Sequence, residues 1–109
     1  MPQTVSMIYK ALVFEKAVSL AVLDTTALVN EAIRRHRLSP VAAAALGRTM
    51  TAAAYLASWL KEDASSLSVS VAGDGAGGKI GVCSDGGLNV RGFIEHPGVE
   101  LPPRADGKL

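Results

Sequence analysis

The segment from Ser39 to Leu60 constrains the fold more than any other part of this chain. Its letters, SPVAAAALGRTMTAAAYLASWL, include a single charged residue, Arg48. Serine is a favoured helix N-cap and proline a favoured first helical residue, so the pattern predicts a helix that begins at Ser39-Pro40 and covers 41–60. Alanine contributes little hydrophobicity, and a central arginine costs about 2.5–3.5 kcal/mol on membrane-insertion scales. We therefore expect a buried helix, central to the core or part of a subunit interface, and no membrane span.

Side-chain size divides this predicted helix into two sides. Small residues on one side would let another backbone approach closely: Ala43, Gly47, Thr51 and Ala54. Larger residues supply bulk elsewhere: Leu46, Met50, Leu56, Trp59 and Leu60. We expect the few aromatic residues of the chain to fill the core: Tyr9, Phe14, Tyr55, Trp59 and Phe93.

Composition limits the classes of function. The 109 residues suggest one domain, and 49% hydrophobic with 19% charged residues is typical of a folded protein. The net charge of +1 predicts no bulk attraction to nucleic acid or to a membrane. The single cysteine, Cys83, excludes an intrachain disulfide framework and a multi-cysteine metal site within these residues. No charged-then-apolar leader opens the chain, so we expect a cytoplasmic protein.

The remaining segments indicate short strands and one further helix. Runs 7–14 and 17–23 predict a hairpin joined by the two residues Glu15 and Lys16. Asp24 or Thr25 can cap a helix whose apolar face is Leu28, Val29, Ala32 and Ile33. Three more strands are predicted over 67–72, 79–84 and 88–96, the last two joined by the turn residues 85–87, and the tail 97–109 reads as an extended crossing segment. The fold class is α+β, with an antiparallel-rich sheet of about five strands on two helices, the second long, Ala-rich and buried.

The segment Gly73–Lys79, GDGAGGK, has the glycine spacing G-x-G-x-x-G. A dinucleotide fingerprint needs those glycines between a strand and a helix, but a further strand follows here, and no Ser or Thr follows Lys79 as in a Walker loop. We interpret the segment as a hairpin bend, with Asp74 suited to a turn. The alternative is a small ligand- or nucleotide-binding domain, or an enzyme, that uses the Gly73–Lys79 loop and Cys83.

Other reactive side chains predict no catalytic, cofactor or metal site. Residues 34–37, RRHR, match the negative end of a helix dipole, with a nucleic-acid patch as the alternative. His36 has no second metal ligand at a helical spacing. A fold could bring Cys83 near His96 across neighbouring strands, although nothing in the sequence requires it. Cys83 is expected to be a small buried hydrophobe at a strand end, with a nucleophile or redox sensor as the alternative.

Several motifs together resemble one known family. Residues 24–61, DTTALVNEAIRRHRLSPVAAAALGRTMTAAAYLASWLK, are followed in order by GDGAGGK, NVRGFIEHP and ELPP. This arrangement resembles the amino-terminal part of the heat-shock protein 33 family from about Lys10 onward. One departure is Ala76-Gly77, where the family often has Pro and Leu. The resemblance implies a redox-regulated holdase chaperone of the bacterial cytosol that binds unfolded client proteins, forms a homodimer and is not an enzyme.

The cofactor of that family does not carry over to this sequence. The resemblance implies a later carboxy-terminal module in which a cysteine quartet, C-x-C and C-x-x-C, holds zinc when reduced. Cys83 matches none of those cysteines. We therefore expect residues 1–109 to form a partial amino-terminal chaperone core domain without the zinc and redox module, in which exposed parts of the strands bind clients.

Overall fold

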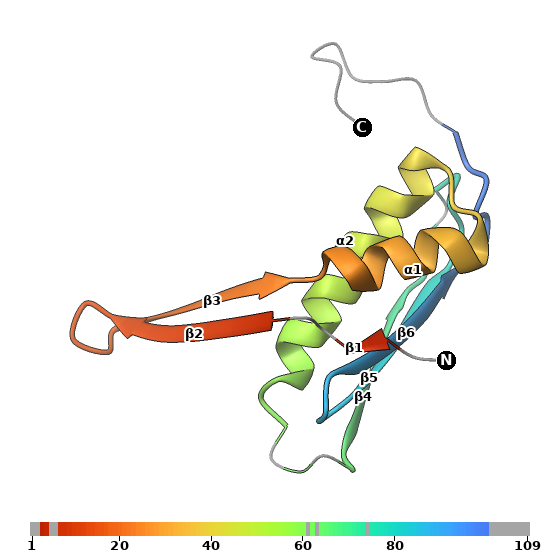
Figure 1. The fold of residues 1–109 in the computed structure, drawn as a ribbon. Helices are drawn as coiled ribbons and strands as arrows, with labels where there is room; N and C mark the ends of the chain where they lie inside the picture. Colours follow the sequence, from red (N-terminus) through yellow and green to blue (C-terminus); the bar gives the residue numbers. More distant parts are fainter. Residues whose placement is uncertain (1–2, 5–6, 61, 63, 74, 101–109) are drawn as a thin grey trace.

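The computed structural model describes residues 3–4, 7–60, 62, 64–73 and 75–100. Their order is β1 (Gln3–Thr4), β2 (Met7–Val13), β3 (Val18–Asp24), α1 (Thr26–His36), α2 (Pro40–Ala57), β4 (Ser66–Val71), β5 (Ile80–Asp85) and β6 (Asn89–Ile94) (Figure 1). The α+β class is confirmed. The five predicted strands are divided between two antiparallel sheets, a β2–β3 hairpin and a sheet of order β1-β6-β5-β4.

Helix α2 covers one face of the larger sheet and contacts β4, β5 and β6. Its start is as predicted: the Ser39 side chain accepts a hydrogen bond from the Ala42 amide, and proline stands at the first position. The helix ends at Ala57, before the predicted Leu60, because the next amides donate to carbonyls three residues back in a tighter turn. Ala42, Leu46 and Ala53 are fully buried, whereas Arg48 lies on an exposed side. The helix is thus buried along one side only.

The predicted close approach on α2 occurs at Gly47. A Cβ atom at this position would lie 3.0 Å from Cγ1 of Val29 on α1. On α1 itself, Leu28 and Ala32 are buried, as predicted for its apolar face. Thr25 occupies the N-cap position, but the Asp24 carboxylate accepts the hydrogen bond from the Thr26 amide.

Two of the three hairpin connections have different outcomes. The last β2–β3 pair is Val13 with Val18, so the loop has four residues, 14–17, and the predicted two-residue turn is wrong. Tight two-residue turns favour Asn-Gly, which this chain lacks, and here Phe14, Glu15 and Lys16 all have positive φ. Gly73–Lys79 does connect two antiparallel strands, β4 and β5, as predicted. Asp74 and the tail residues 101–109 lie outside the described residues.

The prediction that the aromatic residues fill the core is wrong. Most of them are about half exposed or more, with Tyr55 partly buried: Tyr9 61%, Phe14 79%, Trp59 55% and Phe93 48%. The alanines of α2 bring the helix close to the sheet, so the space between them is filled by aliphatic side chains such as Leu46, Val82 and Val90. No helix among the described residues has the length and apolar character needed to cross a membrane.

Candidate functional site

The β2–β3 hairpin extends away from the rest of the molecule (Figure 1). Its exposed apolar side chains, 47–79% accessible, define what we call the apolar ribbon: Met7, Tyr9, Leu12, Phe14, Val18, Leu20 and Val22. The register pairs Tyr9 with Val22 and Ala11 with Leu20. Cross-strand partners point to the same face, so most of the ribbon forms one continuous apolar surface.

The opposite face of the hairpin is attached to the end of α2. Lys10 Nζ donates a hydrogen bond of 3.0 Å to the Ser58 carbonyl oxygen and lies 3.7 Å from the centre of the Trp59 ring. Tyr55 packs edge-on against Trp59, with the ring centres 6.3 Å apart. Leu23 packs against the core from the same face of the hairpin. These contacts orient the hairpin and leave the Tyr9 face open.

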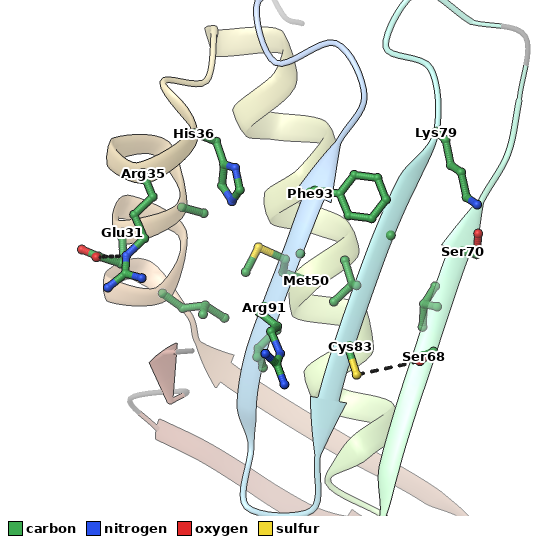
Figure 2. A pocket seen from close by; sticks show the side chains of 17 residues that line it. Glu31, Arg35, His36, Met50, Ser68, Ser70, Lys79, Cys83, Arg91 and Phe93 are labelled. Atoms are coloured by element: carbon green, nitrogen blue, oxygen red, sulfur yellow. Dashed lines mark hydrogen bonds and ion pairs between the residues drawn. The ribbon is translucent and has the colours of Figure 1, made fainter. Parts of the chain in front are cut away.

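A second surface lies on the face of β4–β5–β6 that α2 does not cover. A cavity of about 650 Å³, which we call the sheet groove, extends over this face to α1 (Figure 2). The register arranges its outward side chains in two rows across the strands, listed from β4 to β6 as Ser68, Cys83 and Arg91, and Ser70, Gly81 and Phe93. Met50 lines the groove from α2, between α1 and β6 (Figure 2).

Phe93 lies across Gly81 in the second row. A Cβ atom at Gly81 would be only 2.5 Å from Cε1 of the Phe93 ring. The ring is 48% exposed, so it presents an accessible apolar face within the groove. The absence of a side chain at residue 81 is what allows this position.

The charged residues lining the sheet groove are mostly cationic. Arg35, Lys79 and Arg91 line it together with one carboxylate, Glu31. Glu31 is hydrogen-bonded by Arg34 and by Arg35, and these bonds lower the pKa of its carboxyl from 4.5 to about 2. Glu31 is therefore ionised at neutral pH but already neutralised by two guanidinium groups.

The sequence-predicted site residues do not form a reaction centre. Strand register pairs Cys83 with Arg91, three strand residues or about 10 Å from Ile94, and His96 lies two residues beyond the end of β6, where its amide donates to the Gly77 carbonyl. The hypothesis of a Cys83–His96 pair is therefore wrong. Cys83 is only partly buried, with its Sγ 3.8 Å from Ser68 Oγ. Both Cys83 and Lys79 line the sheet groove.

The glycine loop and the arginine cluster are engaged in local structure. Gly78, with φ of +70°, donates its amide to the Gly75 carbonyl at 3.1 Å, and a strand follows the loop directly. Arg34 and Arg35 are held by Glu31. Arg37 ends α1 in a left-handed conformation, and its amide donates to the Ile33 carbonyl. These contacts support the interpretations of a hairpin bend and a helix end.

Comparison with known families gives a clear match. The family model described as Hsp33 protein matches residues 6–109. This chain belongs to the Hsp33 family. Its relatives include proteins named 33 kDa chaperonin from Nostoc punctiforme, 52% identical over 87 residues, and from Microcystis aeruginosa, 53% identical over 87 residues. Each alignment covers 78% of this chain and 28% of the relative, so the chain spans less than a third of their length.

A solved structure agrees with the Hsp33 assignment. The crystal structure of the 33 kDa chaperonin (heat shock protein 33 homolog) from Thermotoga maritima matches with a TM-score of 0.83 and 33% identity. The match covers 93% of this chain and 34% of the Thermotoga chain. The predicted resemblance to the Hsp33 family is therefore confirmed in both sequence and fold.

The zinc site implied by the Hsp33 resemblance does not fit these residues. Within the part of the chain that the structure describes, no three His, Cys, Asp or Glu side chains are grouped so that they could hold a metal ion. Cys83 is the single cysteine of the sequence, whereas the implied site needs four.

Sequence reasoning missed the apolar ribbon and the composition of the sheet groove. The signal for the ribbon was present, because runs 7–14 and 17–23 are apolar at successive positions with little alternation. Such runs are typical of strands buried on both faces. In this Hsp33 chain the same residues are exposed.

Proposed function

We propose that this chain is a holdase chaperone that binds unfolded proteins and prevents their aggregation without making or breaking a bond. The observation that carries the proposal is the apolar ribbon, seven apolar side chains at 47–79% exposure. Soluble proteins rarely expose large contiguous apolar patches unless these bind something. Membership of a family whose relatives are named chaperonins supports this reading.

The hairpin offers an unfolded chain two kinds of interaction. Burial of the ribbon against apolar client side chains contributes about 25 cal/mol per Å². Among the described residues, β2 and β3 pair only with each other, so each has an outer edge to which an extended client can add a strand. Both interactions are independent of client sequence, as binding of many unfolded proteins requires.

Light scattering from an aggregating, chemically denatured client tests the proposal. The wild-type chain in molar excess should suppress scattering, and the variant Y9T/L20T/V22T should lose most of this effect, because threonine keeps strand propensity but removes apolar area. The variant A11T/S19T changes the same hairpin without removing large apolar side chains and should stay active. Unchanged scattering with the wild-type chain would contradict holdase activity. A triple variant that still suppresses scattering would show that the apolar ribbon is not the client-binding surface.

We also propose that the chain forms a homodimer. The outer side of α2 carries a shallow hollow of about 490 Å³ whose small residues would let a second copy approach closely: Ala43, Ala44, Thr51 and Ala52. Sedimentation velocity over a concentration series should show a dimer at micromolar concentration, and A52R should yield monomers. A wild-type chain that sediments as a monomer throughout would contradict this proposal.

We infer that client binding by this chain depends on neither zinc nor oxidation. The switch implied by the family resemblance uses four cysteines, and Cys83 alone cannot supply it. A cytoplasmic location is part of the same proposal, since a free thiol suits a reducing compartment. Suppression of aggregation should be equal with chelator, with peroxide and with a reductant, and C83S should behave like the wild type. A strong increase on oxidation would contradict this inference.

The alternative function, binding of a nucleotide or a similar small ligand, is favoured by one observation. Lys79 of the glycine loop and Cys83 both line the sheet groove. The loop lacks the helix N-terminus that supplies free amides to a phosphate, so we expect no heat on titration with nucleoside triphosphates. Saturable heat that disappears in K79Q would support the alternative.

A further inference from the structure

We propose that the sheet groove selects extended client segments in which an apolar side chain is flanked by acidic side chains two residues away on each side. This inference rests on the proposed binding of unfolded proteins and names the class of segment that one surface prefers. It concerns the outer face of β5 and β6, which is separate from the apolar ribbon.

The position of Phe93 supplies the apolar contact. The ring lies over Gly81 and is 48% exposed, with Met50 beside β6 in the same groove (Figure 2). Aromatic rings with an accessible face contribute apolar contact area at a low cost in conformational entropy. A leucine or phenylalanine of a client can therefore pack on this ring.

The backbone of β6 favours an extended ligand. β1 pairs with β6 only at Asn89 and Val90. Within the described residues, the register therefore gives Arg91–Ile94 no strand partner on the side that faces α1 (Figure 2). A client main chain in the groove can form ladder hydrogen bonds along that edge.

Two cations flank the Phe93–Gly81 row along the strands. Lys79 is two residues from Gly81 on β5, and Arg91 is two residues from Phe93 on β6, in the opposite direction. The Cα positions of Lys79 and Arg91 are thus about 13 Å apart along the sheet, the length of four strand residues. An extended client whose side chains face the groove at every second position would place acidic groups at both cations and an apolar group between them.

The surrounding charges favour an acidic partner over a basic one. Arg35 lines the α1 side of the groove and is paired there with Glu31. Glu95 is the carboxylate residue opposite Lys79, since its amide donates to the Lys79 carbonyl, and its Oε1 lies 3.4 Å from His96 Nε2. Asp85 lies near Arg91, but its carboxylate accepts hydrogen bonds from Asn89, which are the main cause of its lowered pKa. Within the described residues, Lys79 and Arg91 form no ion pair closer than 4.0 Å. Complementary charge would attract acidic segments and repel basic ones.

Fluorescence anisotropy with labelled peptides and the full 109-residue chain tests this selection. Three peptides differ only in the central five residues: Asp-Ser-Leu-Ser-Asp, Lys-Ser-Leu-Ser-Lys, and the rearranged Asp-Asp-Leu-Ser-Ser. The first should bind about tenfold more tightly than the second, because two exposed ion pairs replace two repulsions. It should also bind more tightly than the third, which has the same composition but the wrong spacing.

A matched pair of double variants assigns the effect to the groove. K79Q/R91Q should abolish the preference among the three peptides, whereas K16Q/R37Q, which removes two cations that do not line the groove, should keep it. For the wild type, 0.5 M salt should reduce the difference in affinity between the first two peptides severalfold. This measurement does not depend on whether a variant folds.

The outcomes separate this inference from the proposed function. Equal affinity for all three peptides, or a preference that survives in K79Q/R91Q, overturns the inference while ribbon-dependent suppression of aggregation stands. A chain that binds the peptides as predicted but fails to suppress aggregation overturns the holdase proposal instead. Absence of binding to every peptide and every denatured client overturns both.

Discussion

The hairpin β2–β3 and the sheet formed by β4, β5 and β6 are both antiparallel and rich in strand-forming residues, yet they differ in what covers them. Along β5, buried residues alternate with half-buried ones, because Ile80, Val82 and Ser84 face α2. Every residue of β2 and β3 is exposed or half-buried. The difference shows that strand propensity is sufficient to form a pair of strands, whereas burial of their side chains requires a helix that packs against the sheet. Stability should therefore reside in the helix-covered sheet, and binding in the hairpin.

The same substitution in the two regions should show this difference most strongly. Leu46 on α2 is fully buried, so L46A should lower the free energy of unfolding by about 2–5 kcal/mol through lost contacts and a residual cavity. Leu20 on β3 is 54% exposed, so L20A should change the free energy of unfolding by less than about 1 kcal/mol. Urea titrations followed by circular dichroism measure both. Equal losses would show that the hairpin is packed as tightly as the core.

The contact that joins the two regions should have a smaller effect. Removal of the Lys10 ammonium in K10M deletes its contact with the Trp59 ring and its hydrogen bond to Ser58, together about 0.5–1 kcal/mol. Amide hydrogen exchange should become faster in β2 and β3 and stay unchanged in β5. K16M, at the exposed hairpin tip, is the matched control, and equal exchange in both variants would show that Lys10 does not hold the hairpin.

The smallest effect should come from the ion cluster on α1, within the helix-covered part of the molecule. Arg34 and Arg35 lower the pKa of the Glu31 carboxyl from 4.5 to about 2. A lowered pKa in the folded state adds stability that is present above the ordinary pKa and is lost as the pH falls from about 4.5 to about 2. The midpoint of urea unfolding should fall over that window in the wild type, and less in E31Q. R34Q/R35Q should flatten the profile in the same way, and an unchanged slope in both variants would contradict this assignment.

Local signals in the sequence were sufficient to predict most of the elements. Ser39 followed by Pro40 marks the start of α2 because capping and a preset φ act within a few residues. The alternation of Leu67 and Val69 with serines predicts a half-covered β4, and the glycines of residues 73–79 predict a bend. Gly47 was recognised as a close-approach position because small residues recur along one side of α2.

The candidate site was less predictable because it depends on which elements meet. Tyr9 and Phe14 are as apolar as core residues, and the projection of the hairpin makes them exposed. The position of Phe93 over Gly81 depends on the β5–β6 register, which no local pattern specifies. The prediction of a two-residue turn at Glu15 and Lys16 was wrong because residues Phe14 to Lys16 adopt left-handed conformations that their residue types disfavour, and no local pattern indicates this.

The missing side chain at residue 81 separates the shape of the outer sheet face from the packing of the interior. Any replacement at this position would lift the Phe93 ring off β5 and make the cavity shallower, while Ile80 and Val82 keep their contacts with α2 on the other face of the strand. The shape of the outer sheet face and the packing of the interior are thereby uncoupled at neighbouring positions. Exchange of a single outward residue can reshape the groove without rebuilding the interior that keeps the protein folded.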